Sequence, residues 1–77
     1  MTRMPEAPVV LRPDLALIAD WIGAGSRVLD LGCGDGALMA HLQSAKQCRG
    51  YGVEIDDAAV LRCVRRGVDV IQRNIEA

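Results

Sequence analysis

One stretch, residues 27–36, constrains the fold of this chain more than any other. It reads Arg-Val-Leu-Asp-Leu-Gly-Cys-Gly-Asp-Gly, an apolar run typical of a buried parallel strand, followed by three alternating glycines. Glycine adopts positive φ angles without strain and lets another molecule approach the backbone closely. The residues that follow predict a helix from Ala37 to Leu42, whose free N–H groups point back at the glycines. The stretch therefore predicts a strand–loop–helix unit that cradles a ligand.

Two acidic side chains distinguish between the ligands that use such a loop. The segment also satisfies G-x-G-x-x-G/A, the dinucleotide fingerprint, but Asp30 ends the strand and Asp35 lies inside the loop. Like charges 4 Å apart near a protein surface repel by roughly 4 kcal/mol, so these carboxylates disfavour a pyrophosphate. A ligand with an ammonium and a sulfonium group is attracted instead, which favours S-adenosylmethionine over NAD. Asp30 is then the partner of the amino group, directly or through water, and its alternative is a capping or solvated carboxylate.

A further acidic residue ends the next expected strand. Glu54 follows Gly32 at close to the spacing of about 20 residues at which nucleotide-binding folds place a carboxylate on the ribose. A carboxylate suits both ribose hydroxyls because its two oxygens only accept hydrogen bonds. The alternative is a solvated acid at a strand end. We expect Ile55 to pack against the adenine face.

The apolar periodicity and the turn residues predict an α-β-α-β-α-β order. The expected helices cover residues 13–22, 37–42 and 58–64, and the expected strands cover residues 28–31, 51–55 and 68–72. Right-handed crossovers place these strands in one parallel sheet, in spatial order 3-2-1. Residues 1–10 are expected to form an extended lead-in and residues 44–50 a loop, while Trp21 is expected to close one end of the core.

The length of the chain limits what it can build. Its 77 residues make at most one small domain, although a hydrophobic content of 51% argues against disorder. In a complete doubly wound fold the first strand is central, with a fourth strand beside it. We therefore expect either a fragment of a longer protein or pairing with another chain, such as a second copy, through the open edge of the first strand.

Composition excludes several functions. A net charge of −1 gives no electrostatic reason to expect binding to nucleic acid or an anionic membrane. No apolar run approaches the 20 or so residues needed to span a bilayer, and nothing directs the chain out of the cytoplasm. Three scattered cysteines and one histidine do not form a zinc set, so we expect no metal site.

The sequence of residues 28–36 resembles the first motif of class I S-adenosylmethionine-dependent methyltransferases. Together with the runs at 11–15, 52–56 and 66–72, the chain is similar to the MetW family of methionine-biosynthesis proteins from Leu11 onward. The resemblance implies a partial α/β fold, a Rossmann-like three-layer sandwich, in which residues 11–77 form the N-terminal half of a cofactor-binding domain. It implies S-adenosylmethionine or S-adenosylhomocysteine as the ligand. The expected binding residues are Asp30, Gly32, Cys33, Gly34, Gly36, Glu54, Ile55 and Asn74.

The resemblance also implies a role in methionine biosynthesis alongside homoserine O-acyltransferase. Asn74 lies where many methyltransferases carry an acidic residue near the adenine amino group, and its amide oxygen can accept that N–H without the charge. Methyl transfer needs mainly the alignment of donor and acceptor, so no residue is assigned a catalytic role, and a catalytic or a regulatory part stays open. The alternatives are a non-enzymatic module that pairs through its sheet edge and, less favoured, an NAD-dependent oxidoreductase.

Overall fold

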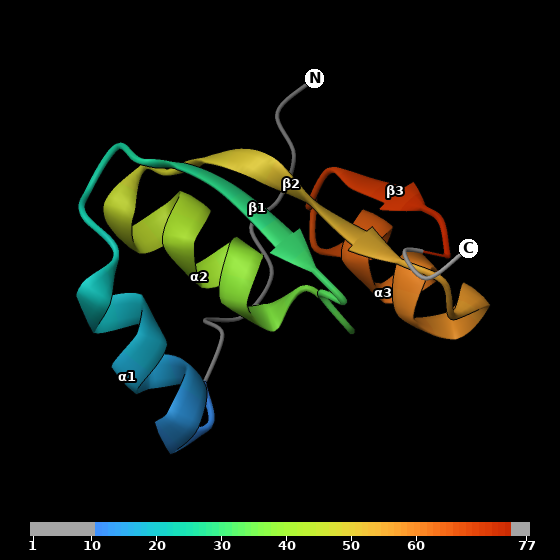
Figure 1. The fold of residues 1–77 in the computed structure, drawn as a ribbon, viewed down its shortest axis with the longest axis horizontal. Helices are drawn as coiled ribbons and strands as arrows, with labels where there is room; N and C mark the ends of the chain where they lie inside the picture. The colour runs from blue at the N-terminus through green and yellow to red at the C-terminus, as the bar shows by residue number, and fades with distance from the viewer. Residues whose placement is uncertain (1–10, 75–77) are drawn as a thin grey trace.

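The computed structural model describes residues 11–74, so the lead-in expected at residues 1–10 lies outside the described part. The elements are α1 (Pro13–Trp21), β1 (Arg27–Leu31), α2 (Ala37–Lys46), β2 (Arg49–Glu54), α3 (Asp57–Arg65) and β3 (Val70–Gln72). The strands form one parallel sheet in the order β1-β2-β3 (Figure 1). The expected element order, strand order and partial Rossmann-like α/β fold are confirmed.

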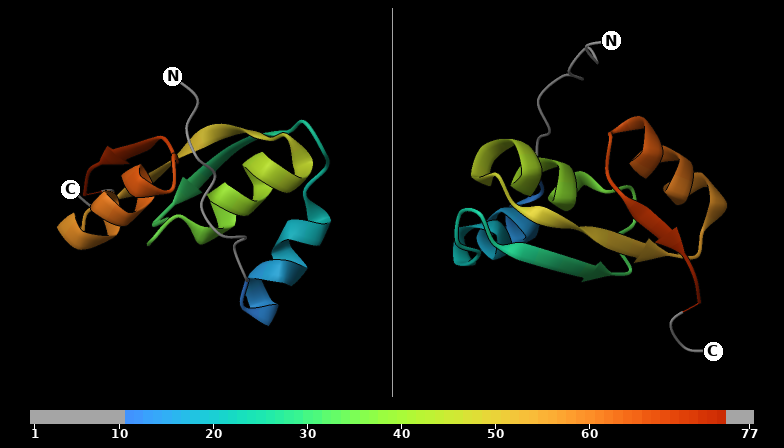
Figure 2. Two further views of the ribbon diagram at one scale, coloured as in Figure 1. Left: turned by 180° about the vertical axis from the view of Figure 1, so that it is seen from behind. Right: turned by 90° about the horizontal axis from the view of Figure 1, so that it is seen from above.

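Helices α2 and α3 lie on the same face of the sheet (Figure 2). Successive strand residues point to opposite faces, so Val28 and Val70 pack toward these helices, against a core that contains Met39 and Cys63. On the opposite face Val53 is buried, but four other apolar residues are 42–58% exposed: Leu29, Leu31, Tyr51 and Ile71. The described part thus forms a sheet layer and one helix layer, with β1 at an open edge.

Helix α1 packs against α2 through a second core cluster, which includes Ala19 and Leu42. The Nζ of Lys46, the last residue of α2, donates to the carbonyl oxygens of Ala19 and Ile22, the latter at 2.7 Å. This tertiary contact holds the end of α2, and Ala45 and Lys46 are themselves strong helix formers, so the helix runs beyond its predicted end at Leu42. The loop predicted at residues 44–50 is confirmed only at residues 47 and 48, because α2 runs to Lys46 and β2 begins at Arg49.

Trp21 does not close the core, as predicted, but is 76% exposed. Each helical residue is rotated by about 100° from the one before, so Trp21 lies on the side of α1 roughly opposite Ala19. Because Ala19 is the buried residue of this helix, the tryptophan is turned outward.

Helix α3 has an acidic cap at its N-terminus and a glycine after its C-terminus. Asp56 caps its N-terminus by accepting from the backbone N–H of Ala59 at 2.8 Å, and Gly67 follows its C-terminus with φ +75°. The N–H of Val68 donates to the carbonyl oxygen of Cys63 at 2.9 Å, and its side chain is buried. Val68 therefore belongs to the helix termination, which is why β3 starts at Val70 rather than at the predicted residue 68.

Candidate functional site

The glycine loop after β1 has an open front and a packed back. Gly32, Gly34 and Gly36 have φ angles of +73°, +58° and +80°. A Cβ atom added to Gly32 or Gly34 would meet nothing within 4 Å, whereas one added to Gly36 would lie 2.9 Å from the Sγ of Cys63. We call the side formed by Asp30, Gly32 and Gly34 the open front, and the side formed by Gly36, the Cys33 thiol and Cys63 the packed back.

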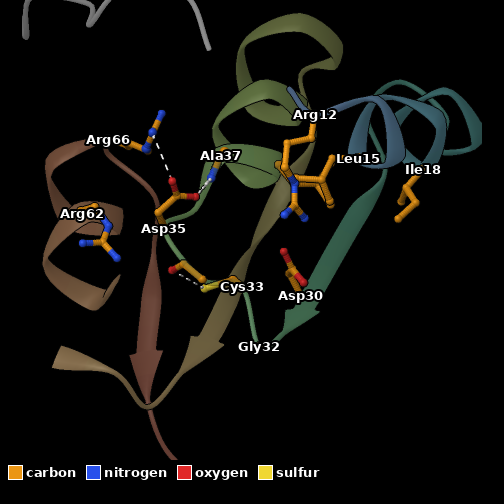
Figure 3. A pocket seen from close by; sticks show the side chains of 12 residues that line it. Arg12, Leu15, Ile18, Asp30, Gly32, Cys33, Asp35, Ala37, Arg62 and Arg66 are labelled. Carbon is orange, nitrogen blue, oxygen red and sulfur yellow. Dashed lines mark hydrogen bonds and ion pairs between the residues drawn. The ribbon is translucent and has the colours of Figure 1, made fainter. Parts of the chain in front are cut away.

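A cavity of about 630 Å³ lies over the open front (Figure 3). This volume falls within the range of roughly 300–1,000 Å³ that is usual for small-molecule sites. Its lining residues come from α1 and the segment before it, from β1 and the loop, and from α2 and α3: Arg12, Leu15, Ile18, Asp30, Gly32, Cys33, Gly34, Asp35, Ala37, Leu38, Arg62 and Arg66. The structure thus brings four of the predicted binding residues together at one cavity: Asp30, Gly32, Cys33 and Gly34.

Asp30 presents a carboxylate with no hydrogen bond or ion pair to any other residue between 11 and 74. Its side chain is half-buried, and this burial raises the pKa of the carboxyl group above its ordinary value of 3.8. It caps no backbone N–H group in the described part, so the capping interpretation does not apply there. An acceptor in this state is open to a cationic group in the cavity.

Both carboxylate oxygens of Glu54 accept hydrogen bonds from backbone N–H groups. Its Oε1 accepts from the N–H of Gly34, and its Oε2 accepts from the N–H groups of Ile55 and Asp56, each at 2.9 Å. These bonds, first those from Asp56 and Gly34, lower the pKa of the Glu54 carboxyl group. Because a carboxylate accepts about four hydrogen bonds, about one position remains for an outside donor. Glu54 therefore ties the glycine loop to the end of β2, and its contact with a ribose stays a prediction.

The Cys33 thiol points into the packed back rather than toward the cavity. Its Sγ lies 3.7 Å from the Sγ of Cys63, whose thiol donates to the carbonyl oxygen of Gly34 at 3.1 Å. Burial, followed by the hydrogen bond with Cys63, raises the pKa of Cys33 to about 12. Any ligand contact of Cys33 would thus be made by its backbone. Among residues 11–74 no group of three or more metal-ligating side chains could hold an ion.

Ile55 and Asn74 lie outside the cavity lining, at the ends of β2 and β3. Ile55 is 56% exposed, and Asn74 is exposed two residues after β3. The N–H of Arg73 donates to the carbonyl oxygen of Glu54 at 3.1 Å, which places the two strand ends side by side. They share the carboxyl edge of the sheet, where parallel α/β folds bind their ligands. Their contact with an adenine base stays a prediction.

The structure changes the electrostatic argument for Asp35. Its Oδ1 accepts from the N–H of Ala37 at 3.1 Å, and its Oδ2 lies 3.5 Å from the Nη2 of Arg66. Since Arg66 offsets its charge, Asp35 does not repel an anion in the way the sequence suggested. The preference for a cationic ligand therefore depends on Asp30.

Sequence reasoning missed several cavity residues. Arg12, Leu15 and Ile18 approach the loop from the N-terminal side, and Arg62 and Arg66 approach it from α3. From sequence, Leu15 and Ile18 belong to the expected helix at residues 13–22, and Arg12 belongs to a run that resembles the family, but neither pattern indicates a cavity. The place of these residues at the cavity depends on how α1 packs on α2, which no local pattern reveals.

Solved structures show which class of protein has this arrangement. A methyltransferase from Thiobacillus denitrificans, dependent on S-adenosylmethionine and solved with S-adenosylhomocysteine, matches with a TM-score of 0.70 and 26% identity over 80% of this chain and 29% of its own. Coclaurine N-methyltransferase, bound to N-methylheliamine and S-adenosylhomocysteine, matches with a TM-score of 0.66 and 30% identity over 83% of this chain and 22% of its own. The chain therefore has part of the class I methyltransferase fold.

The family follows from the sequence comparison. The model of the methionine biosynthesis protein MetW matches residues 12–77, and the chain belongs to the MetW family. A curated relative, the bifunctional methionine biosynthesis protein MetXA/MetW of Rhodopirellula baltica, is 36% identical over 81 residues. The match covers 92% of this chain and 13% of that relative. None of the helices between residues 11 and 74 could span a bilayer.

Proposed function

We propose that this protein binds S-adenosylmethionine and its product S-adenosylhomocysteine on the open front of the glycine loop. The observation that carries the proposal is the half-buried Asp30 carboxylate, which has no partner among residues 11–74 and borders the 630 Å³ cavity. The positions of Gly32 and Gly34 support it, because side chains there would project into open space that a ligand needs. The two solved neighbours that hold S-adenosylhomocysteine agree with this ligand class.

Each predicted residue receives a role in this proposal. Asp30 accepts from the ligand's amino group, and the backbone of residues 32–34 runs along the ligand. Glu54 offers its remaining acceptor position to a ribose hydroxyl, Ile55 packs on the adenine, and Asn74 accepts from the adenine amino group. Gly36 supports the loop from behind. The cofactor, when bound, supplies a methyl group on a sulfonium, and these residues bind and orient it.

Isothermal titration tests the ligand class. S-adenosylhomocysteine should bind saturably and NAD should not, and Asp30→Asn should weaken the first ligand about tenfold or more by removing a charge-assisted hydrogen bond. Asp20→Asn, at an exposed acid of α1, is the control and should leave the affinity unchanged. Saturable heat with NAD and none with S-adenosylhomocysteine would overturn the proposal.

We further propose a role in methionine biosynthesis, in the cytoplasm, with residues 11–77 as the N-terminal half of the cofactor-binding domain and homoserine O-acyltransferase as a partner. The relative whose name joins MetXA and MetW in one protein favours this role. Mixing the full-length protein with a homoserine O-acyltransferase in sedimentation velocity should give a faster species than either alone. Two unchanged peaks at micromolar concentrations would count against the partnership.

A second candidate function is a non-enzymatic module that pairs with a second copy of the chain through the edge of β1. The observation in its favour is that β1 is an edge strand of the sheet formed by residues 11–74, and that its Leu29 and Leu31 are 55% and 58% exposed on the face away from α2 and α3. Sedimentation equilibrium should then show a dimer that Leu29→Lys dissociates. A strict monomer with an ordered sheet would contradict this candidate.

A further inference from the structure

The run at residues 11–15 reaches the cavity through Arg12. The carbonyl oxygen of Arg12 accepts from the N–H of Ala16 at 2.9 Å, which fixes Arg12 at the start of α1. Its side chain lines the cavity together with Leu15 and Ile18, across from the glycine loop. Figure 3 shows the guanidinium of Arg12 directed into the cavity on the same side as Asp30.

We propose that Arg12 binds the carboxylate at the amino-acid end of the ligand, beside the ammonium group held by Asp30; this rests on the proposed function. An α-amino acid carries its ammonium and its carboxylate on one carbon, so the groups that bind them must lie close together. Of the three arginines that line the cavity, Arg12 is in the part of the cavity where Asp30 lies (Figure 3). Arg62 and Arg66 approach the loop from α3, and Arg66 is paired with Asp35.

The present contacts of Arg12 leave it able to take this role. Its Nη2 lies 3.3 Å from the Oδ2 of Asp14, and both side chains are largely exposed, at 73% and 65%. An ion pair between exposed groups is weak, so a ligand carboxylate can replace Asp14. A guanidinium has five N–H donors in a planar fork, which suits a carboxylate held through two parallel bonds. Leu15 and Ile18 provide the apolar wall for the methylene groups between the charges and the sulfur.

Two ligands isolate the amino-acid end. S-adenosylhomocysteine carries it, while 5′-methylthioadenosine has the same nucleoside and thioether without it. Titrations of both into the full-length protein should show that Arg12→Gln weakens S-adenosylhomocysteine about tenfold or more and leaves 5′-methylthioadenosine unchanged. Arg12→Lys should lose part of the same affinity, because it keeps the charge but not the fork. Arg27→Gln, at an exposed arginine of the opposite end of β1, is the matched control and should change neither affinity.

The outcomes separate this inference from the proposed function. If Arg12→Gln binds S-adenosylhomocysteine as tightly as the wild type, or weakens both ligands equally, Arg12 does not hold the carboxylate and the inference is overturned while the cofactor site stands. If the wild type binds neither ligand, the proposed function fails and the inference fails with it. The urea midpoint of each variant shows that the comparison is made between folded proteins.

Discussion

At the end of β1, Asp30 has no bonding partner among residues 11–74, whereas at the end of β2 Glu54 accepts three backbone N–H bonds. Burial raises the pKa of the first carboxyl group, and hydrogen bonds lower that of the second. In the sequence both are acids at the end of an apolar strand. The hydrogen bonds that a carboxylate already makes within the protein decide how many acceptor positions remain for a ligand. Glu54 therefore has a structural role as well as a proposed binding position.

The glycines repeat this contrast within one loop. Gly32 and Gly36 have similar positive φ angles, yet open space surrounds a Cβ at the first, and Cys63 and Val68 crowd a Cβ at the second. The front of the loop is therefore shaped to leave room, and the back is shaped to pack. The predictions below test this division, from the largest expected effect to the smallest.

The thiol of Cys33 should be almost inert in the folded protein. A pKa of about 12 instead of 9.0 leaves roughly a thousandfold less thiolate at pH 8, and the thiolate is the reactive form. Mass spectrometry after iodoacetamide treatment should show Cys33 unmodified in the native protein and modified in urea. If the native protein is alkylated at Cys33 as fast as a free exposed thiol, the Cys33 side chain lies on the open front, and the division into an open front and a packed back is wrong.

Gly36→Ala should destabilise the fold by about 2–4 kcal/mol, because the strain of a positive φ adds to a clash with Cys63. Gly32→Ala should cost only the backbone strain, about 1–2 kcal/mol. Gly25→Ala is the matched control, since Gly25 has φ +75° and open surroundings away from the loop. Urea unfolding measures all three, and equal losses at Gly36 and Gly25 would show that the back is not closely packed.

Glu54→Gln should lower stability at neutral pH, because glutamine has one acceptor oxygen for bonds now shared by two. The folded-state pKa of Glu54 lies below the ordinary value of 4.5, so its contribution is present above that value and is lost as the pH falls through the folded pKa. The difference in stability between the variant and the wild type should therefore shrink at acidic pH. Urea midpoints between pH 7 and pH 3 measure it, and a difference that stays constant would contradict the role of these bonds.

Asp30→Asn should stabilise the fold slightly at pH 7, by about 0.5 kcal/mol, since solvent still reaches the side chain. The folded-state pKa of Asp30 is raised, so the wild type loses stability as the pH rises from the ordinary value of 3.8 through the folded pKa. The variant should lack that loss. A destabilised Asp30→Asn would mean that the carboxylate holds the structure together, as Glu54 does.

Local patterns were enough to predict most of the fold. The apolar run at residues 28–31 and the glycines after it were enough to predict one strand and its turn. The boundaries that failed depend on distant contacts, such as the bonds from Lys46 to α1 that hold the end of α2. The exposure of Trp21 likewise follows from which side of α1 meets α2.

From the sequence, only the location of the candidate site at the carboxyl ends of the strands could be predicted. Strand ends gather at one edge of a parallel sheet, so Asp30 and Glu54 could be placed near the loop from sequence. That Glu54 already bonds three N–H groups, and that Arg66 offsets Asp35, are facts of side-chain geometry. The place of Arg12 at the cavity could not be predicted, because Arg12 is distant from the glycine loop in sequence and no local pattern indicates that the two are close in space.

The most direct test of the central claim, that the open front holds the cofactor, is an amide spectrum of ¹⁵N-labelled protein titrated with S-adenosylhomocysteine. If the ligand lies on the open front, the resonances of Gly32 and Gly34 should shift most, that of Gly36 should shift less, and that of Gly25 should stay in place. Shifts as large at Gly25 as at Gly32, or no shift at Gly32 and Gly34 at saturating ligand, would contradict the claim.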